Sequence, residues 1–484
     1  MDRYAVINIV KFLSVVGLAV AVFFSLCVVT GWYYGESIGT FALFVVALAS
    51  VNGVIYLLLR RYEMRMRLKE GIVAVNVTWV LLAAAGSVPL MLMTDIGFSD
   101  AFFEAMSGFT TTGATIYRDI EALPHAVLML RSVMHWMGGM GVIVLGVGLF
   151  SLINPSGSLA LFKAESTGIS LEKATPRIKD TAFGLWSVYV GLTVADAVLL
   201  KIAGMDWFDA INHAMSTIST GGFSTKNASL GAFDSYGIVW ITTLFMTLSG
   251  INFLAHIRLF SAASTAGYRR EEVMWYLGLI VLLSFVLSGV DAFVDADNGW
   301  HALTHATFTV VSVMTTTGFA TLDYAQWGHI AIAVVFTAML LGGNAGSTAG
   351  GVKIIRYIVL FKNLSAQMVR TLHPKAMVGV FVDGKRIDGM TIASVTGFIL
   401  LFVLANMSVA LYLFACGYDA MTSVSTALAT LGNIGPGFAL TGPAENYAFF
   451  TDTQKWVLSF AMMAGRLEFY TLFLLFSRHF WKRF

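Results

Sequence analysis

The chain has 484 residues, of which 57% are hydrophobic and only 12% are charged, and its mean hydropathy is +0.77. A soluble globular chain is about one-quarter charged, so this composition excludes a protein whose surface is covered by polar groups in water. The net charge of +2 gives no reason to expect nucleic acid as a partner.

Ten apolar segments are long enough to cross a bilayer, because a transmembrane helix needs about 20 apolar residues. In chain order they are 8–30, 39–59, 71–93, 127–150, 181–203, 237–259, 275–294, 329–352, 391–415 and 456–477. The first is too long and too uninterrupted for a signal peptide, so we expect it to be a retained helix. The sequence therefore predicts an all-α, multi-pass membrane protein with ten transmembrane helices.

Basic residues gather in the connections that follow the even-numbered segments, as in 60–69 and 478–483. The opposite connections contain few, such as Arg118 and Lys226. Since Lys and Arg are enriched in cytoplasmic loops, both termini are expected in the cytoplasm.

Four shorter segments between these spans align without gaps. They begin at Asp100, Asp209, His305 and Asp419. They end in the sequences Thr111-Thr112-Gly113, Thr220-Gly221-Gly222, Thr316-Thr317-Gly318 and Thr430-Leu431-Gly432, the last followed by Asn433. Repeated spacing of this kind indicates four copies of one structural unit.

Each copy is interpreted as a half-length helix that enters the membrane and stops. An Asp at its start is expected to cap the helix, and the glycine allows backbone angles at its end that other residues resist. Irregular backbone at this depth requires a water-filled cavity or surrounding protein. Four such ends around one axis would offer rings of oxygen atoms to a cation, with Asp95, Glu104 and Asp119 expected near the outer mouth.

At these residues the chain resembles the Trk/Ktr/HKT superfamily of potassium translocation proteins, in which four repeats, each with a filter glycine, surround one pore. The helices before Arg60 resemble those of its TrkH/TrkG branch. The resemblance implies ten transmembrane helices plus four re-entrant pore helices. It divides the chain into two additional N-terminal helices (1–70) and four repeats, at 71–165, 166–270, 271–390 and 391–484.

Three further motifs support the resemblance, at 135–141, 342–353 and 463–468. Loop 342–351 is implied to be a gate under the filter, with Gly343, Gly346, Ser347, Gly350, Lys353 and Arg466 as gate residues. The small residues of this loop disfavour helix, although they could also serve close helix packing. Arg466 could instead pair with an acid such as Glu468, and Lys353 could be an anchor at the inner membrane face.

The resemblance implies potassium uptake across the bacterial inner membrane, with potassium bound at the filter residues and no organic cofactor in this chain. It also implies a homodimer in the lipid bilayer, with one pore per subunit, and a cytosolic TrkA-type regulatory subunit that binds nucleotide. Segment 376–387 reads as a hairpin turning at Asp383-Gly384 and offers a contact surface for such a partner.

Three alternatives remain open. A rocking carrier with broken helices is one, although such carriers usually have two inverted repeats. A sodium-permeable relative is another, because 429–433 has fewer hydroxyls than the other copies; in plant relatives, however, sodium transport goes with serine at the position of Gly113. The third is a metalloenzyme, in which His301 and His305 could share a helix face, but the Glu that follows the first His in zinc proteases is absent. The family resemblance implies a transporter, not an enzyme.

Overall fold

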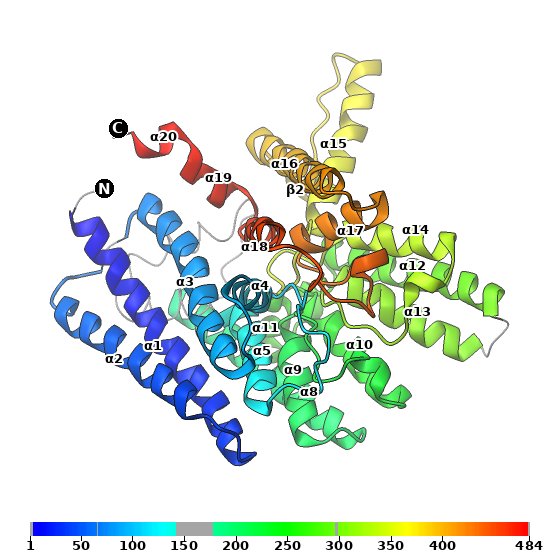
Figure 1. The fold of residues 1–484 in the computed structure, drawn as a ribbon. Coiled ribbons are helices and arrows are strands. Elements are labelled where there is room, and N and C mark those ends of the chain that lie inside the picture. Colours follow the sequence, from blue (N-terminus) through cyan, green and yellow to red (C-terminus); the bar gives the residue numbers. More distant parts are fainter. Residues whose placement is uncertain (1–2, 65, 142–177, 296–298, 483–484) are drawn as a thin grey trace.

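The computed structural model describes residues 3–64, 66–141, 178–295 and 299–482, and these are almost entirely helical. The inner part of the expected span 127–150 and the expected boundary between repeats 1 and 2 lie outside the described residues. The two ends of the described chain lie near each other in Figure 1, whereas α15 projects from the body of the molecule.

Two long helices precede the repeats, α1 (Arg3–Tyr33) and α2 (Gly39–Leu59). They pack against each other, and α1 also packs on α3 and α5 of the first repeat. In the connection between them, the Glu36 carboxylate accepts hydrogen bonds from the backbone N–H groups of His125 and Ala126. This acidic group therefore caps the N-terminus of α5 and ties the additional helices to the first repeat.

The four repeats share one order of elements: a long first helix, a short helix, an extended return segment and a second helix, which breaks in the last three repeats. The first helices are α3 (Leu68–Thr94), α8 (Ile178–Ile202), α12 (Glu271–Asp295) and α16 (Gly389–Ala415). The short helices are α4 (Phe98–Phe109), α9 (Trp207–Ile218), α13 (Gly299–Met314) and α17 (Ala420–Leu431). The second helices begin as α5 (His125–Trp136), α10 (Tyr236–Ser249), α14 (His329–Leu340) and α18 (Asp452–Arg466).

Smaller elements follow the second helices or join the others. They are the π-helical turn η1 (Met137–Gly141), the helices α11 (Phe253–Ala262), α15 (Ile354–Leu372), α19 (Tyr470–Phe476) and α20 (Arg478–Trp481), and the 3₁₀ turns η2 (Ser229–Ala232), η3 (Thr265–Gly267), η4 (Tyr324–Gln326) and η5 (Ala439–Thr441).

Six described helices are long and apolar enough to span a membrane: α1, α2 and the four first helices. Two bent pairs add further candidates, α10 with α11 at 98° and α18 with α19 at 118°. The expectation of unbroken helices over 237–259 and 456–477 was therefore wrong. After the first break, Asn252 is the N-cap of α11. At the second break, Glu468 and Phe469 have positive φ, which ends α18.

A two-stranded hairpin of β1 (Phe381–Val382) and β2 (Lys385–Arg386) follows α15. Asp383 and Gly384 form its turn, both with positive φ, as a tight hairpin requires. The hairpin predicted in 376–387 is thus confirmed. The Asp383 carboxylate accepts a hydrogen bond from the backbone N–H of Glu271 at 2.8 Å, which attaches the hairpin to the start of α12.

Candidate functional site

The four short helices are positioned by their N-terminal residues. Asp206 and Asp419 are N-caps, accepting hydrogen bonds from the backbone N–H groups of Asp209 (2.6 Å) and Thr422 (3.0 Å). Asp100 and Asp209 lie inside the first turn of their helices, so the expectation that each starts its helix as the cap was wrong for these two. Acidic groups in a first turn still favour the helix electrostatically.

The chain leaves each short helix with the same backbone shape. The second residue after each helix has a φ between 53° and 56°; these residues are Thr111, Thr220, Thr316 and Asn433. Two residues further on, a glycine has a φ between 80° and 97°; these glycines are Gly113, Gly222, Gly318 and Gly435. A left-handed conformation held by a threonine is unusual, and here it occurs in three of the four copies.

The four glycines close a ring. The α-carbon of each faces a backbone carbonyl of the next repeat so closely that a Cβ atom would overlap it. In ring order these carbonyls belong to Gly221 (facing Gly113), Thr317 (facing Gly222), Ile434 (facing Gly318) and Thr112 (facing Gly435). The last contact returns to the first repeat, so all four extended segments surround one axis.

The fourth copy enters this ring three residues later than the ungapped alignment predicts. Leu431 is the last residue of α17, Gly432 is its C-cap with an ordinary φ of −81°, and Thr430 lies inside the helix. Gly432 therefore lies outside the ring, and Gly435 occupies the ring position expected of it. The alignment gave Asp419 the same position in its repeat as Asp100 and Asp209. Asp419, however, is the N-cap of its helix, whereas Asp100 and Asp209 lie inside the first turn.

Side-chain bonds hold the ring from behind. The hydroxyls of Thr110 and Thr112 share a hydrogen bond of 2.8 Å, and those of Thr315 and Thr317 repeat it at the same distance. The Asn433 amide donates to the Thr112 hydroxyl at 3.0 Å. The first, third and fourth copies thus use side-chain oxygen and nitrogen to fix backbone positions.

The second helices of the last three repeats break just below the ring, and in the first repeat α5 passes into the π-helical turn η1 at the same level. Gly138 lies against the carbonyl of Phe109, the last residue of α4, and Gly465 lies against that of Leu431, the last residue of α17. In both cases a Cβ would overlap the oxygen, so glycine lets the second helix approach the end of the pore-lining segment. Only the break in the third repeat was predicted from the sequence.

Loop 342–351 crosses beneath the ring and is bonded to it. The Gly350 N–H donates to the Thr316 hydroxyl at 2.6 Å. The Thr348 hydroxyl lies 3.0 Å from the carbonyl oxygen of Ile218 and 3.2 Å from that of Ser249. The loop therefore contacts the filter segments or short helices of both the second and third repeats.

Further bonds anchor the loop to the second repeat and to α12. The Asn344 N–H donates to the Gly250 carbonyl at 2.9 Å, and the Gly346 carbonyl accepts from the Phe253 N–H at 3.0 Å. The Glu272 carboxylate accepts from the Ala345 N–H at 2.6 Å. Two other predicted gate residues make local bonds: the Gly343 carbonyl accepts from the Ile354 N–H at 3.2 Å, and the Ser347 hydroxyl donates to the Asn344 carbonyl at 2.6 Å.

Arg466 joins three elements under the ring. Its guanidinium donates to the carbonyl of Thr348 at 3.0 Å and to those of Gly138 and Gly139 at 2.8 and 2.9 Å. It thus connects the loop of the third repeat with the π-helical turn η1 of the first. Glu468 forms an ion pair with Arg356.

Lys353 is buried and donates to the Ala349 carbonyl within the loop. Its ammonium therefore lies within the loop predicted to be the gate instead of at the surface expected of a membrane-face anchor.

The acidic residues expected at the outer mouth divide into two kinds. Asp95 and Asp119 are exposed, and a hydrogen bond from the Asn227 amide, at 2.9 Å, holds the pKa of Asp119 below its usual value. Glu104 is fully buried and forms an ion pair with Arg131. Because the arginine neutralises it, Glu104 does not add to the negative charge of the mouth.

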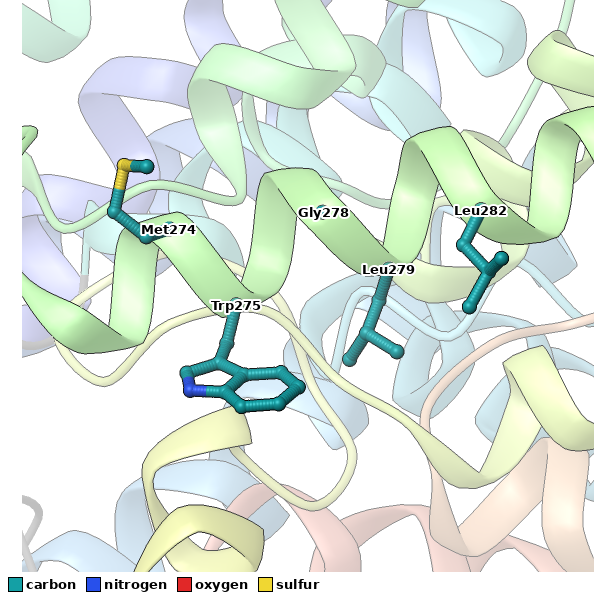
Figure 2. A pocket seen from close by; sticks show the side chains of 5 residues that line it. All are labelled: Met274, Trp275, Gly278, Leu279 and Leu282. Carbon is teal, nitrogen blue, oxygen red and sulfur yellow. The ribbon is translucent and has the colours of Figure 1, made fainter.

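Two other features lie apart from the ring and the loop. His305 shares a hydrogen bond of 2.8 Å with the Thr321 hydroxyl, and the described residues contain no group of three or more His, Cys, Asp or Glu that could hold a metal. A shallow groove on α12 is lined by Met274, Trp275, Gly278, Leu279 and Leu282. Figure 2 shows these apolar side chains on the flank of a helix that is apolar enough to face lipid.

Comparisons with known proteins agree with this geometry. The model of the TrkH family, described as "Cation transport protein", matches residues 37–483. The Trk system potassium uptake protein TrkH of Salmonella typhimurium is 37% identical over 447 residues, which is 91% of each chain. TrkG of Escherichia coli is 34% identical over 463 residues, 94% of each chain. The crystal structure of the potassium transporter TrkH from Vibrio parahaemolyticus superposes with a TM-score of 0.89 at 32% identity, over 99% of this chain and 100% of that one.

Proposed function

Because this chain belongs to the TrkH family of cation transport proteins, we infer that it is the membrane subunit of a Trk-type potassium uptake system. The observation that carries this inference is the closed ring of four glycines, each against a carbonyl of the next repeat. A ring of backbone carbonyls can replace the water shell of a desolvated monovalent cation. The family is one of transport proteins, and this chain's role is transport, not enzymatic catalysis.

Potassium is proposed to bind along the four segments of the ring. The carbonyl ligands are proposed from 111–113, 220–222, 316–318 and 433–435, with the Thr hydroxyls of the first three as further candidates. The C-terminal ends of the four short helices add partial negative charge beside this site. The fourth segment offers Asn433 where the others have Thr, so the ring has fewer hydroxyl oxygens on one side.

The direction of transport follows from the membrane potential. An inside-negative potential supplies about 2.3 kcal/mol per charge per 100 mV, which drives potassium inward without a chemical step. Asp95 and Asp119 would concentrate cations at the outer mouth. We propose that loop 342–351 and Arg466 obstruct the path below the ring until regulation moves them.

The proposed arrangement in the cell follows the family. We propose ten transmembrane helices and four re-entrant pore helices in a bacterial inner membrane, with both termini cytoplasmic. We also propose a homodimer and a TrkA-type nucleotide-binding partner. The hairpin β1–β2, with exposed Lys385 and Arg386, offers that partner a basic surface beside α12.

Cation flux into liposomes containing the purified chain tests the function. Potassium, rubidium, sodium and lithium are compared under the same gradient, with and without the regulatory subunit. Flux of potassium and rubidium well above that of lithium supports a selective pore. If neither flux nor cation binding occurs with the partner present, the pore is contradicted and the bent helix pairs α10–α11 and α18–α19 would favour a rocking carrier.

A further inference from the structure

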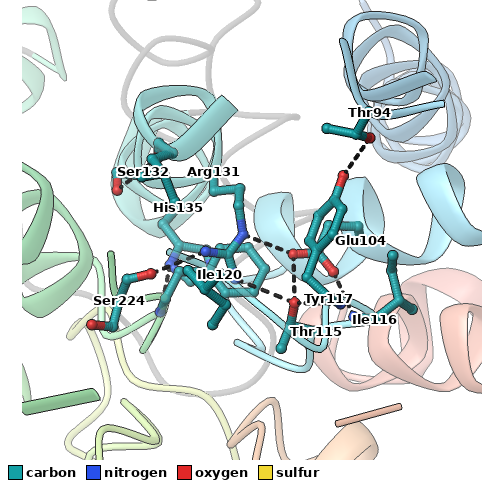
Figure 3. Close-up of polar contacts among 12 residues, drawn as sticks. Thr94, Glu104, Thr115, Ile116, Tyr117, Ile120, Arg131, Ser132, His135 and Ser224 are labelled. Atoms are coloured by element: carbon teal, nitrogen blue, oxygen red, sulfur yellow. Dashed lines mark hydrogen bonds and ion pairs between the residues drawn. The ribbon is translucent and has the colours of Figure 1, made fainter. Parts of the chain in front are cut away.

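A buried ion pair lies directly behind the filter at one corner of the ring. Glu104 on α4 and Arg131 on α5 are 0% and 1% exposed, and the arginine Nε donates to the glutamate Oε1 at 2.8 Å. Figure 3 shows the two side chains meeting between their helices. Burying two charges is costly unless further hydrogen bonds satisfy both groups. The other hydrogen-bond partners of the two side chains therefore show which parts of the chain the pair holds.

Those partners are the return segments of two different repeats. Glu104 Oε2 accepts from the Ile116 N–H at 2.9 Å, and Oε1 accepts from the Thr115 hydroxyl at 3.0 Å. Arg131 Nη1 donates to the Ser224 carbonyl at 3.0 Å (Figure 3). Thr115 stands two residues after Gly113, and Ser224 stands two residues after Gly222. The ion pair therefore bridges neighbouring filter segments just beyond their ring glycines.

Helix α5 adds a second contact one turn away. Its His135 shares a hydrogen bond of 2.9 Å with the Ser216 hydroxyl and stacks on Phe223 with ring centroids 4.0 Å apart. The guanidinium of Arg131 covers the same Phe223 ring at 4.0 Å. Gly221 lies so close to His135 that a Cβ would overlap the imidazole. The filter segment of the second repeat thus rests on side chains from the first.

The ion pair belongs to one repeat only. Glu104 lies five residues before the end of its short helix; the residues at this position in the four repeats are Glu104, His213, Thr309 and Thr426. Arg131 is the seventh residue of its second helix; the residues at that position are Arg131, Thr242, Val335 and Leu458. Only the first repeat has opposite charges at these two positions.

We propose that Arg131 and Glu104 are positioning residues that set the cation selectivity of the filter. They act by fixing the spacing between the first and second filter segments. Sodium is smaller than potassium, so a ring that can contract at one corner coordinates sodium better. Removing the ion pair frees Thr115, Ile116 and Ser224 together, and the corner then loosens. This proposal rests on the proposed potassium pore and names what holds its spacing.

The test measures the potassium-to-sodium permeability ratio in liposomes for Glu104→Gln, Arg131→Lys and the double variant Glu104→Gln/Arg131→Met. The matched control is Asp100→Asn/Lys455→Met, which removes another ion pair of α4, nearer the N-terminus of that helix. We expect the ratio to fall by about tenfold in the double variant, less than the roughly 10²-fold effect of a 1 Å misplacement in a preorganised site, and by a smaller factor in each single variant, which keeps part of the hydrogen bonding. The control should keep the ratio of the unchanged protein.

Folding defects are separated from selectivity by the choice of variants. The double variant leaves no buried charge unpaired. Its permeability ratio is used whenever a single variant fails to purify. An unchanged ratio in a purified test variant, even with lower potassium flux, would overturn the proposal and make the pair a structural support alone. If the unchanged protein itself shows no preference for potassium, the proposed function is contradicted, whereas an effect missing only in the variants contradicts the role of the ion pair.

Discussion

Gly318 faces the carbonyl oxygen of Ile434 so closely that no side chain fits between them. This contact joins the third and fourth filter segments and places Gly435, not Gly432, in the ring. Gly435 has a φ of 97°, and a Cβ there would overlap the Thr112 carbonyl. The identity of the fourth filter glycine is therefore open to direct test.

Gly435→Ala is expected to lower both potassium flux and the potassium-to-sodium ratio, because alanine resists this φ and its methyl group would displace the Thr112 carbonyl. Flux assays in liposomes measure both quantities. Gly442→Ala, in the same return segment with a φ of −60°, serves as the control and should match the unchanged protein. Retained selectivity in Gly435→Ala together with its loss in Gly432→Ala would restore the ungapped alignment.

Gly113→Ser is expected to weaken potassium-over-sodium discrimination more than it lowers the amount of folded protein. Its Cβ would overlap the Gly221 carbonyl and push one oxygen out of the ring. The control is Gly97→Ser, at the N-cap of α4, where a Cβ meets no atom within 4 Å and serine is a favourable cap. A well-expressed Gly113→Ser protein with unchanged selectivity would count against the filter assignment.

Arg466→Ala is expected to raise basal flux without the regulatory partner. The substitution removes three hydrogen bonds that connect the loop to the first repeat, and it removes a positive charge from the proposed path. Arg478→Ala, an exposed position near the chain end, is the control. Loss of flux in a folded Arg466→Ala protein would identify the arginine as a structural partner instead of a barrier.

Glu272→Leu is expected to release loop 342–351 and also raise basal flux. It leaves the half-buried Ala345 N–H without its acceptor, at a cost of up to about 1–3 kcal/mol to the present position of the loop. Glu272→Gln keeps an acceptor and should behave nearly as the unchanged protein. The neighbouring Glu271→Gln, which weakens the ion pair with Lys362, is a second control, and equal flux in all three variants would exclude a role for Glu272 in holding the loop.

The sequence predicts the membrane class and three of the four ring glycines because both depend on local patterns. Apolar length and the recurring Thr-x-Gly sequence are visible without a structure. The fourth copy was misplaced because an acidic residue stabilises a helix start either as a cap or inside the first turn, so Asp419 and Asp209 look alike in sequence. The Gly435-Pro436-Gly437 sequence was the available signal for a turn in that segment.

Other features could not be read from local patterns. Glu104 and Arg131 lie on different helices, and their pairing depends on how α4 and α5 pack, so the carboxylate was expected at the outer mouth. The breaks near Gly250 and Gly465 were also missed, since glycine in a membrane helix equally well indicates close packing. Only in 342–351 are small and polar residues dense enough to disfavour a helix in the sequence alone.

The broken second helices give the molecule separate outer and inner mechanical units. In the last three repeats, α10, α14 and α18 lie beside the ring, whereas α11, α15 and α19 begin anew after the breaks. A force applied to the inner segments, for example at the hairpin beside α15, can rotate them about these joints without bending the outer segments. Because the Gly350 N–H is also bonded to the Thr316 hydroxyl, a movement of loop 342–351 would act on the ring as well.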